Sequence, residues 1–478
     1  MRDAIEWALT IVVLLGALPL VAGCYQFGLA GLHRFRRHTS GALDGEPRVA
    51  VVIPAWNEAA VIGRTIDRLV GLDYPAERLR VYVVDDASTD VTPDVVRAKA
   101  GEHPGRVFHL RREVGGQGKA HTLNHGLRQI RAEGWFEAVL ITDADVIFTA
   151  QSLRRMTRHL GDATVGAVTA YIKEGSRPSN ALNRFVAFEY ISAQAGARRA
   201  QNVLGAQACL AGGAQLLRRE SLEAIGGLID TSSLAEDTFT TFDVQLAGWR
   251  VVFEPHAIVW AEEPRDMAGL WKQRLRWGRG NVQVTMHYRR NWLRGRRIGR
   301  LGGASFALIW FSVLLMPLLM TAASAALVIL FVLDREASID AFRGLWALNL
   351  VTYLFITLSS FALDPEAARR SWREAIMFPG AISLAIIVVA AVPGLADDLP
   401  DALLLFTYVW LSASMLAAYL VRRLEATRLG WAARPLLYLV GYGPLLCAIT
   451  AAAYLQEVRG REMAWEKTQK TGAVGDLA

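Results

Sequence analysis

The sequence predicts an α/β domain with a mostly parallel, doubly wound sheet, joined to a helical region that crosses a membrane several times. Two observations carry this prediction. In the first part of the chain, short apolar segments alternate with polar stretches of helical spacing, which is typical of parallel strands joined by helices. After residue 303, long apolar stretches follow one another. Hydrophobic residues make up 53% of the 478 residues, which is too many for a single soluble domain.

The first apolar stretch covers residues 5–32 and carries no charge after Glu6 until His33 and Arg34. It exceeds the roughly 20 residues that a helix needs to cross a bilayer. A cleaved signal peptide would have a shorter apolar core and a basic start. Here the basic cluster HRFRRH follows the apolar stretch instead. By the positive-inside rule, the N-terminus faces outward and the chain beyond the cluster lies in the cytosol.

A soluble domain is expected to begin at about residue 48. Its predicted strands are five apolar segments, at residues 49–53, 81–84, 107–110, 138–142 and 165–169. Between the first two strands, apolar residues from Val61 to Val70 recur at helical spacing. No Gly-x-Gly-x-x-Gly motif follows the first strand, which argues against a dinucleotide-binding fold of the Rossmann type.

The second half of the chain predicts membrane-spanning helices. Apolar stretches long enough to span a bilayer cover residues 303–333, 344–363, 375–394, 402–421 and 435–456. The charges between these stretches alternate in sign, which predicts alternating crossings from a cytosolic start. Five crossings would place the basic tail outside, so either one stretch is re-entrant or the first, which contains Pro317, is not a single span. We expect a cytosolic tail and leave the number of spans open.

These features divide the chain into four parts. They are an N-terminal transmembrane helix with a basic linker (1–47), a cytosolic domain with interfacial helices (48–300), transmembrane helices (301–456) and a basic tail (457–478). The net charge of +7 would also suit nucleic acid, but the basic residues cluster beside apolar stretches, so we expect a bilayer and no nucleic acid as partner. The widely spaced cysteines predict neither a metal site nor a disulfide framework; they are Cys24, Cys209 and Cys447.

The segment ITDADVIF places two carboxylates directly after a strand that is apolar enough to be buried. A carboxylate is costly to bury unless it is paired, hydrogen-bonded or bound to a metal. We therefore expect Asp143 and Asp145 at the carboxyl end of the strand, where open α/β sheets bind ligands. A hard divalent cation with phosphate oxygens would account for both. The alternative is a strand end with two solvated aspartates.

Polar residues follow the first two strands as well. In IPAWNE, Pro54 ends the strand, and Asn57 and Glu58 offer an amide and a carboxylate to a ligand. Asn57 can also cap a helix while Glu58 favours the helix dipole, and both roles can hold at once. In VVDDASTD, Asp85 and Asp86 can accept hydrogen bonds from a base or a ribose, as acidic residues do in other nucleotide-binding folds. The alternative for the second segment is a capped turn.

The glycine-rich segment GGQGKAHTLNHGL lets the backbone approach a ligand, and Lys119 adds a positive charge. It lacks the Gly–Lys–Ser/Thr spacing of a Walker A loop. His121 and His125 have the i, i+4 spacing of a metal pair, but no third ligand lies nearby in the sequence, so a polar helix face is the favoured interpretation.

Two later segments complete the set. LAEDTFTTF brings Glu236 and Asp237 beside aromatic residues, where Asp237 could act as a general base or simply form the acidic first turn of a helix. In WKQRLRWGRG, Gln273, Arg276 and Trp277 share one helix face, which suits a phosphate beside a sugar ring. The same segment also suits an amphipathic helix at the membrane interface.

In this order, the motifs resemble the membrane-embedded processive synthases of glycosyltransferase family 2, which make cellulose, chitin, hyaluronan and poly-N-acetylglucosamine. The resemblance covers about residues 48–290 and includes the early Asp, the Asp-x-Asp, the Glu-Asp and the Gln-x-x-Arg-Trp. It implies a GT-A fold, a UDP-sugar donor, Mg²⁺ or Mn²⁺, inversion at the anomeric carbon and export of the product through the same protein.

The resemblance also implies roles for individual residues. Asp85 or Asp86 would contact uridine, Asp143 would lie near ribose or phosphate, Asp145 would bind the metal, Asp237 would deprotonate the acceptor hydroxyl, and Gln273, Arg276 and Trp277 would hold the diphosphate and the acceptor end. Residues 205–227 resemble the acceptor-side segment. Ala235 stands where cellulose synthases usually carry Thr, which favours amino-sugar polymers.

We therefore expect a UDP-sugar-dependent synthase in the cell membrane, taken to be a bacterial inner membrane, with UDP-N-acetylglucosamine as the first candidate donor. The alternative is a transferase that adds one sugar to a lipid carrier or glycolipid. A transporter would be expected to carry charged residues inside its spans, and almost none occur here. An accessory export or regulatory subunit is left open.

Overall fold

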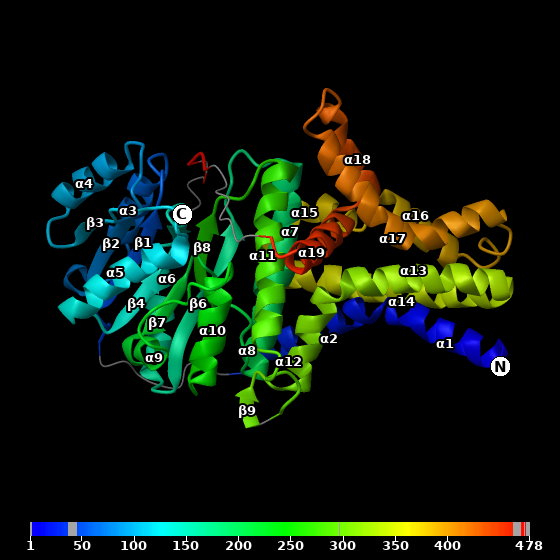
Figure 1. Ribbon diagram of the computed structural model, residues 1–478, viewed down its shortest axis with the longest axis horizontal. Helices are drawn as coiled ribbons and strands as arrows, with labels where there is room; N and C mark the ends of the chain where they lie inside the picture. Colours follow the sequence, from blue (N-terminus) through cyan, green and yellow to red (C-terminus); the bar gives the residue numbers. More distant parts are fainter. Residues whose placement is uncertain (1, 37–44, 296, 462–469, 473, 475–478) are drawn as a thin grey trace.

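The computed structural model describes residues 2–36, 45–295, 297–461, 470–472 and 474. An α/β domain forms one end of the molecule and a bundle of long helices forms the other, with helix α11 (Met267–His287) standing between them (Figure 1). Helix α11 carries the Gln-x-x-Arg-Trp motif, so this motif lies at the junction of the two parts.

The α/β domain is built on one eight-stranded sheet in the order β3-β2-β1-β4-β7-β6-β8-β5. The strands are β1 Val49–Ala55, β2 Leu79–Asp85, β3 Val107–Arg111, β4 Ala138–Ile141, β5 Ile147–Phe148, β6 Val165–Glu174, β7 Gln215–Arg218 and β8 Arg250–Ala261. All five predicted strands are present. The sheet is mixed, however, because β7 runs antiparallel to both β4 and β6, and β5 runs antiparallel to β8.

Helices cover both faces of the sheet, which explains why its central strands are apolar on both sides. Helix α5 packs on β1 and β2 on one face, and α3 packs on the opposite face. The helices of this domain are α3 Ile62–Val70, α4 Thr92–Glu102, α5 Lys119–Glu133, α6 Ser152–Thr157, α7 Ala181–Tyr190, α8 Ala197–Leu204, α9 Arg219–Ala224 and α10 Glu236–Leu246. A short strand, β9 (Arg297–Arg300), follows α11.

Within the part of the chain that the structure describes, three helices are long and apolar enough to cross a membrane, or up to six spans are present if each of three bent helix pairs counts as one. The single helices are α13 Met316–Leu333, α14 Arg335–Leu363 and α17 Asp401–Leu424. The bent pairs are α1 Arg2–Leu15 with α2 Leu18–His33, α15 Pro365–Ile376 with α16 Ala381–Ala391, and α18 Ala433–Val440 with α19 Tyr442–Val458.

Two alternatives were given for the membrane region: that the first apolar stretch is not a single span, or that another stretch is re-entrant. The helices contain a break or a bend that corresponds to each of them. The stretch 303–333 is divided between α12 (Ala304–Leu314) and α13, with Pro317 in the first turn of α13. The stretch 435–456 is bent by 99° between α18 and α19. A proline is tolerated in the first turn of a helix because its missing N–H would have no partner there.

The breaks in two bent pairs touch each other. Gly380 precedes α16 and Gly441 precedes α19, and both have a positive φ. A Cβ atom on Gly380 would lie 2.4 Å from the carbonyl carbon of Val440, and one on Gly441 would lie 2.5 Å from that of Pro379. Only glycine fits such a close crossing, so each break holds the other in place.

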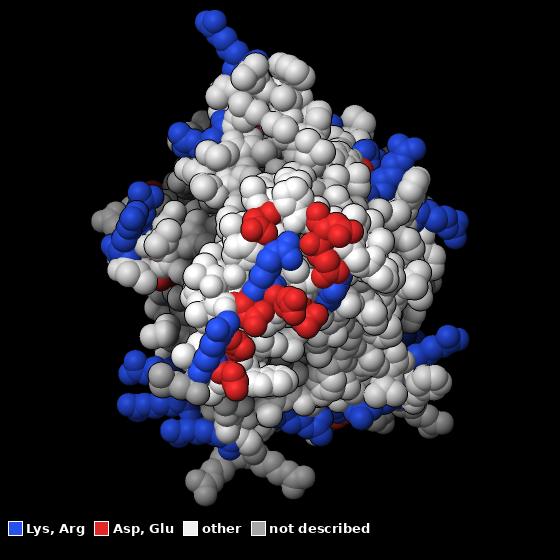
Figure 2. All heavy atoms as spheres, turned by 90° about the vertical axis from the view of Figure 1, so that its right-hand side faces the viewer, with Lys and Arg blue, Asp and Glu red and all other residues white. Residues whose placement is uncertain are grey.

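Acidic residues gather on the end of the helical part that lies farthest from the α/β domain (Figure 2). They include Asp397 and Asp401, which form ion pairs with Arg343 at 2.5 Å and with Arg335 at 2.9 Å. By the alternating charges of the loops, this end is expected on the outer side of the membrane.

Candidate functional site

The predicted polar residues meet at one edge of the sheet because β1, β2 and β4 run parallel. Asp85 is the last residue of β2, and Asp143 follows the end of β4 by two residues. The carboxyl ends of parallel strands in an open α/β sheet form a crevice that binds ligands. The Asp-x-Asp motif therefore lies at the carboxyl end of a strand, as predicted.

Lys119, Asp143 and Glu236 form a cluster at the centre of this edge. Lys119 Nζ, in the first turn of α5, lies 2.5 Å from Asp143 Oδ1 and 3.3 Å from Glu236 Oε1 in the first turn of α10. Burial raises the pKa of Glu236, against the opposing charge of Lys119. Burial would also raise the pKa of Asp143, but the charge and hydrogen bond of Lys119 outweigh it and lower that pKa.

The glycine pair Gly212–Gly213 lets these groups approach one another. A Cβ atom on Gly212 would lie 3.1 Å from Lys119 Nζ and 3.3 Å from Asp237 Oδ2, and one on Gly213 would lie 3.6 Å from Asp143 Oδ2. The segment predicted to lie on the acceptor side, residues 205–227, thus reaches the cluster through its two small residues. Asp237 faces the same turn, and its Oδ1 accepts a hydrogen bond from the N–H of Thr238.

Asp145 is held by a residue from the far end of the chain. Lys470 Nζ lies 2.7 Å from Asp145 Oδ2 and donates a hydrogen bond of 2.6 Å to the carbonyl of Glu262. The buried Glu262 carboxylate accepts the N–H groups of Thr471 and Gly472 at 3.0 Å each.

Val474 continues this contact between the C-terminal segment and the α/β domain. It is buried against Ile147 and Trp260 and forms a β-bridge with Ser176. Residues 457–478 were predicted only to be a basic tail. Apart from the positive charge of this tail, no feature of the sequence indicates the contact.

The two aspartates after β2 have different partners. Asp85 is fully buried, and its carboxylate accepts the N–H of Ser88 and pairs with Arg111 at 2.6 Å. Burial opposes ionisation of Asp85, but hydrogen bonds from His109 and Ser88 and the charge of Arg111 lower its pKa to about 2. Asp86 pairs with Arg112 and accepts the N–H of Gly116, 2.9 Å away in the glycine-rich loop.

Asn57 does not cap helix α3, so the predicted cap is wrong. Helix α3 begins at Ile62, and Asn57 lies in a turn with a positive φ of 54°. The side-chain oxygen of Asn57 accepts the N–H of Thr89 at 2.8 Å, which ties the loop after β1 to the loop after β2. Pro54 does not end the strand as predicted, because β1 continues to Ala55 and Pro54 lies opposite Val84 of β2. Its missing N–H is tolerated there because the pairing of β1 with β4 stops at Val52.

The Gln-x-x-Arg-Trp face is organised by Arg274, which occupies one of the two unspecified positions of the motif. Arg274 is 5% exposed, and its guanidinium makes two hydrogen bonds of 3.0 Å to the carboxylate of Glu189. The guanidinium also donates to Gln273 Oε1 at 2.6 Å and lies 4.1 Å from the centre of the Trp277 ring. Arg274, itself held by Glu189, thereby fixes the positions of Gln273 and Trp277.

The charge of the third motif residue, Arg276, acts on the carboxylates of the central cluster. After burial and Lys119, this charge is a further contribution at both Asp143 and Glu236, where it opposes the effect of burial on the pKa. Helix α11 therefore brings one cation to the sheet edge while its neighbour Arg274 is committed to the protein interior.

Ala235 has a packing role at the start of α10. A Cβ atom on Gly280 of α11 would lie 2.5 Å from the Cβ of Ala235. The small residues at these two positions let α11 pass directly beside the turn that carries Glu236 and Asp237. The sequence suggested that Ala235 reflects the choice of sugar. The close approach of α11 is a steric reason for a small residue at this position.

The carboxylates after β4 can hold cations. Asp143 and Asp145 each bind an ammonium group in the structure, and their hard oxygen atoms suit Mg²⁺ or Mn²⁺. Among the described residues, one group of three side chains lies close enough together to bind a single metal ion, and it lies at the surface: Asp67, Glu102 and His103. Lys99 pairs with both acids of that surface group at 2.8 Å.

Comparisons with known proteins agree with this geometry. Residues 47–280 match the family described as "Glycosyltransferase like family 2". The match covers slightly less than half of the chain, and over this part the chain resembles family 2 glycosyltransferases. It has the GT-A-like fold, which confirms the predicted fold class, and the predicted enzyme class is confirmed as well.

Two curated relatives cover this domain. A probable glycosyltransferase of Bacillus subtilis (strain 168) is 33% identical over 244 residues, which are 51% of this chain and 57% of that protein. The poly-beta-1,6-N-acetyl-D-glucosamine synthase of Staphylococcus aureus (strain COL) is 28% identical over 261 residues, which are 53% of this chain and 61% of that protein. The chain thus spans less than two thirds of the length of either relative.

A solved structure covers more of the molecule. It is a mannosyltransferase from Pyrobaculum calidifontis in complex with GDP-mannose and Mn²⁺, 26% identical with a TM-score of 0.56. The similarity covers 84% of this chain and 100% of that one.

Proposed function

We propose that this protein transfers a sugar from a nucleotide-diphosphate sugar to a growing β-linked polysaccharide and passes the product to its helical part for export. The observation that carries the proposal is the convergence of Lys119, Asp143 and Glu236 at the sheet edge, beside Asp237 and under helix α11. The similarity to a poly-N-acetylglucosamine synthase supports a polymeric product.

The donor is a nucleotide joined to its sugar by a diphosphate. UDP-N-acetylglucosamine is the first candidate because of the synthase relative. GDP-mannose is the second, because the mannosyltransferase in complex with it matches 84% of this chain. In either case, we assign the nucleotide to the loops that follow β1 and β2, which contain Asn57, Glu58 and Asp86.

We assign the reaction to the cluster at the sheet edge. Asp237 accepts the proton of the attacking hydroxyl, and with no second carboxylate assigned as nucleophile, the anomeric carbon is inverted. Lys119 and Arg276 stabilise negative charge on the departing diphosphate. A divalent ion, Mg²⁺ or Mn²⁺, held at Asp145 would add to this charge stabilisation when bound. Gln273 and Trp277 hold the acceptor end.

The location follows from the same assignment. We propose that the α/β domain lies in the cytosol, where nucleotide sugars are made, and that the helical part anchors it in the cell membrane of a bacterium. The contact of Lys470 with Asp145 and Glu262 supports a C-terminal segment on the same side as the α/β domain. This would leave the helical region with an even number of crossings after the domain.

The proposal is tested by incorporation of labelled sugar into product by membranes that contain the full chain. UDP-N-acetylglucosamine, UDP-glucose, UDP-glucuronate and GDP-mannose are supplied separately with Mg²⁺ or Mn²⁺. A long polymer that organic solvent does not extract supports the proposal and names its sugar. A short, extractable glycolipid would replace it with the transfer of one sugar to a lipid, and no incorporation from any donor would overturn both.

A further inference from the structure

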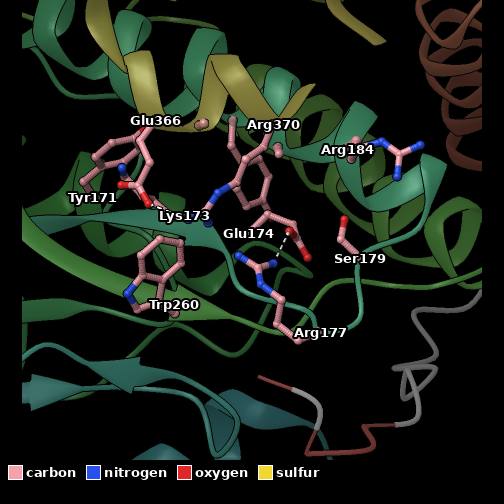
Figure 3. A pocket seen from close by; sticks show the side chains of 12 residues that line it. Tyr171, Lys173, Glu174, Arg177, Ser179, Arg184, Trp260, Glu366 and Arg370 are labelled. Carbon is pink, nitrogen blue, oxygen red and sulfur yellow. Dashed lines mark hydrogen bonds and ion pairs between the residues drawn. The ribbon is translucent and has the colours of Figure 1, made fainter. Parts of the chain in front are cut away.

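A cavity of about 260 Å³ lies between the α/β domain and helix α15, apart from the cluster around Asp143 (Figure 3). Its walls come from β6, β8, α7, α15 and the segment that joins β6 to α7. Among the described residues, four cations and two carboxylates line it, so the lining carries an excess of positive charge. The cations are Lys173, Arg177, Arg184 and Arg370, and the carboxylates are Glu174 and Glu366.

Two of the four cations are held from behind the wall by buried carboxylates. Lys173 Nζ lies 2.7 Å from Asp364 Oδ2, and Arg184 Nε lies 2.7 Å from Glu374 Oε1. Asp364 and Glu374 are buried, neither lines the cavity, and each also accepts a tyrosine hydroxyl group. A ligand in the cavity would therefore lie nearer to these two cations than to the acids that hold them.

The two carboxylates that line the cavity offset only part of the positive charge. Burial raises the pKa of Glu174 to about 7, so this carboxyl is partly protonated at neutral pH. It lies 3.6 Å from Arg177, and Figure 3 shows the two side chains pointing towards each other. Glu366 pairs with Arg370 at 2.8 Å, but more than half of each side chain is exposed, so water screens this pair. One carboxylate also leaves most of the five N–H groups of a guanidinium unused.

Helix α15 places the cavity at the level of lipid headgroups. It follows the candidate span α14 and is bent by 72° from α16. Arg369, Trp372 and Arg373 are exposed on it, and arginines beside an exposed tryptophan are typical of a helix at the membrane interface. Since α15 also packs on α7, this interface is on the side of the bilayer that carries the α/β domain.

Charge and location together indicate the class of ligand. Guanidinium groups bind phosphate through paired, charge-assisted hydrogen bonds, and basic pockets beside membrane helices bind anionic headgroups. The rings of Tyr190 and Trp260 add apolar surface, on which the glycerol end of a lipid can pack. A headgroup that carries its own cation would bring a further positive charge to a lining already rich in arginine.

We propose that this cavity binds the phosphate headgroup of an anionic phospholipid, at a site separate from the donor site. The phosphate contacts Arg177 from the α/β domain and Arg370 from α15, with Lys173 beside them. One lipid then joins the two parts of the molecule and holds the α/β domain against the bilayer. The inference goes beyond the proposed function and does not depend on which sugar is transferred.

The test is native mass spectrometry of the purified full chain in detergent, titrated separately with three probes. Phosphatidylglycerol has a net negative headgroup, phosphatidylcholine carries the same phosphate beside a cation, and glycerol 1-phosphate has no acyl chains. We expect the wild type to bind phosphatidylglycerol roughly tenfold more tightly than either of the others. In Arg177→Gln/Arg370→Gln, which lacks two lining cations, this preference should disappear.

Arg369→Gln/Arg373→Gln is the matched control, because it removes the same charge from exposed positions of α15 outside the cavity and should keep the preference. Ala367→Phe fills the cavity without a change of charge and should abolish the preference, so it decides the matter if the first variant does not fold.

Three results would overturn the inference: equal binding of both lipids by the wild type, the same loss in both double variants, or an unchanged preference in Ala367→Phe. Binding of glycerol 1-phosphate as tight as that of phosphatidylglycerol would also overturn it, by assigning the cavity to a soluble phosphate ester. The measurement needs no sugar donor, so its result is independent of the proposed function.

Discussion

Lys470 Nζ lies 2.7 Å from Asp145 Oδ2, so a residue near the C-terminus neutralises the second carboxylate of the Asp-x-Asp motif. The same ammonium group donates to the carbonyl of Glu262, and the Glu262 carboxylate binds the next two residues of the segment. Lys470 therefore occupies, as a cation, the place where Asp145 would contribute an oxygen to a divalent ion. If Asp145 binds the divalent ion as proposed, the C-terminal segment and the metal compete for one carboxylate.

Replacing Lys470 should strengthen the binding of Mn²⁺. In Lys470→Ala the Asp145 carboxylate loses its cation, so Mn²⁺ no longer has to displace an ammonium group. We expect the dissociation constant for Mn²⁺, measured by electron paramagnetic resonance on the full chain, to fall several-fold. Arg459→Ala, an exposed change near the end of α19, should leave it unchanged. Equal Mn²⁺ affinity in Lys470→Ala and wild type would show that the pair does not compete with the metal.

Asp237 should be required for transfer but not for nucleotide binding. Asp237→Asn keeps the size of the side chain and removes its ability to accept a proton, so we expect kcat to fall by about 10²–10⁴-fold. Binding of UDP or GDP, measured by calorimetry, should change little. Asp230→Asn, in the exposed loop before α10, serves as the control. Turnover at the wild-type rate in Asp237→Asn would remove this residue from the mechanism.

Two neighbouring arginines on α11 should have different effects when replaced. Arg274→Gln leaves the Glu189 carboxylate without its partner in the interior, and breaking a buried ion pair in this way costs about 3–5 kcal/mol of unfolding free energy. Arg276→Gln removes a half-buried cation that acts on Asp143 and Glu236, so it should lower kcat with little loss of stability. Thermal unfolding and turnover, measured on both variants, test this division. The same loss of stability in both would contradict it.

Deprotonation of Glu174 should lower the stability of the protein as the pH rises. Burial raises the pKa of Glu174 from 4.5 to about 7, against the hydrogen bonds from Ser176 and the charge of Arg177. The folded state thus binds the proton more tightly than the unfolded state, and this stabilisation is complete below pH 4.5 and lost as the pH rises through 7. The loss is on the order of 3 kcal/mol.

The variant Glu174→Gln isolates this effect, because its amide does not titrate in this range. We expect the unfolding temperature of the wild type to fall more steeply between pH 5 and pH 8 than that of Glu174→Gln. Parallel curves for the two proteins over this range would mean that the Glu174 carboxylate titrates normally.

Much of the α/β domain could be predicted because its signals are local. Five strands are short apolar segments, and the Asp-x-Asp motif marks the end of one of them. The antiparallel strand β7 was not predicted, since four residues that include Gln215 and Arg218 give no clear strand pattern. The helix expected between β1 and β2 is present, but Asn57 does not cap it, because its side chain accepts a hydrogen bond from a loop 32 residues away.

The remaining features depend on contacts between distant parts of the chain. The number of spans could not be read from apolar stretches, because two helix breaks, at Gly380 and Gly441, are fixed by their contact with each other. The role of Arg274 depends on Glu189, which lies 85 positions earlier in the sequence. Lys470 reaches Asp145 only in the folded chain, so no local pattern marks it as part of the site.

The central claim is that the sheet edge around Asp143 and Asp145 is the site of sugar transfer. The most direct measurement is the initial rate of labelled sugar incorporation by membranes that carry equal amounts of wild type or Asp143→Asn, with UDP-N-acetylglucosamine and then GDP-mannose as donor and Mn²⁺ present. The account predicts incorporation by the wild type from one of these donors and a rate at least a hundredfold lower in the variant. Equal rates in wild type and variant would contradict the claim.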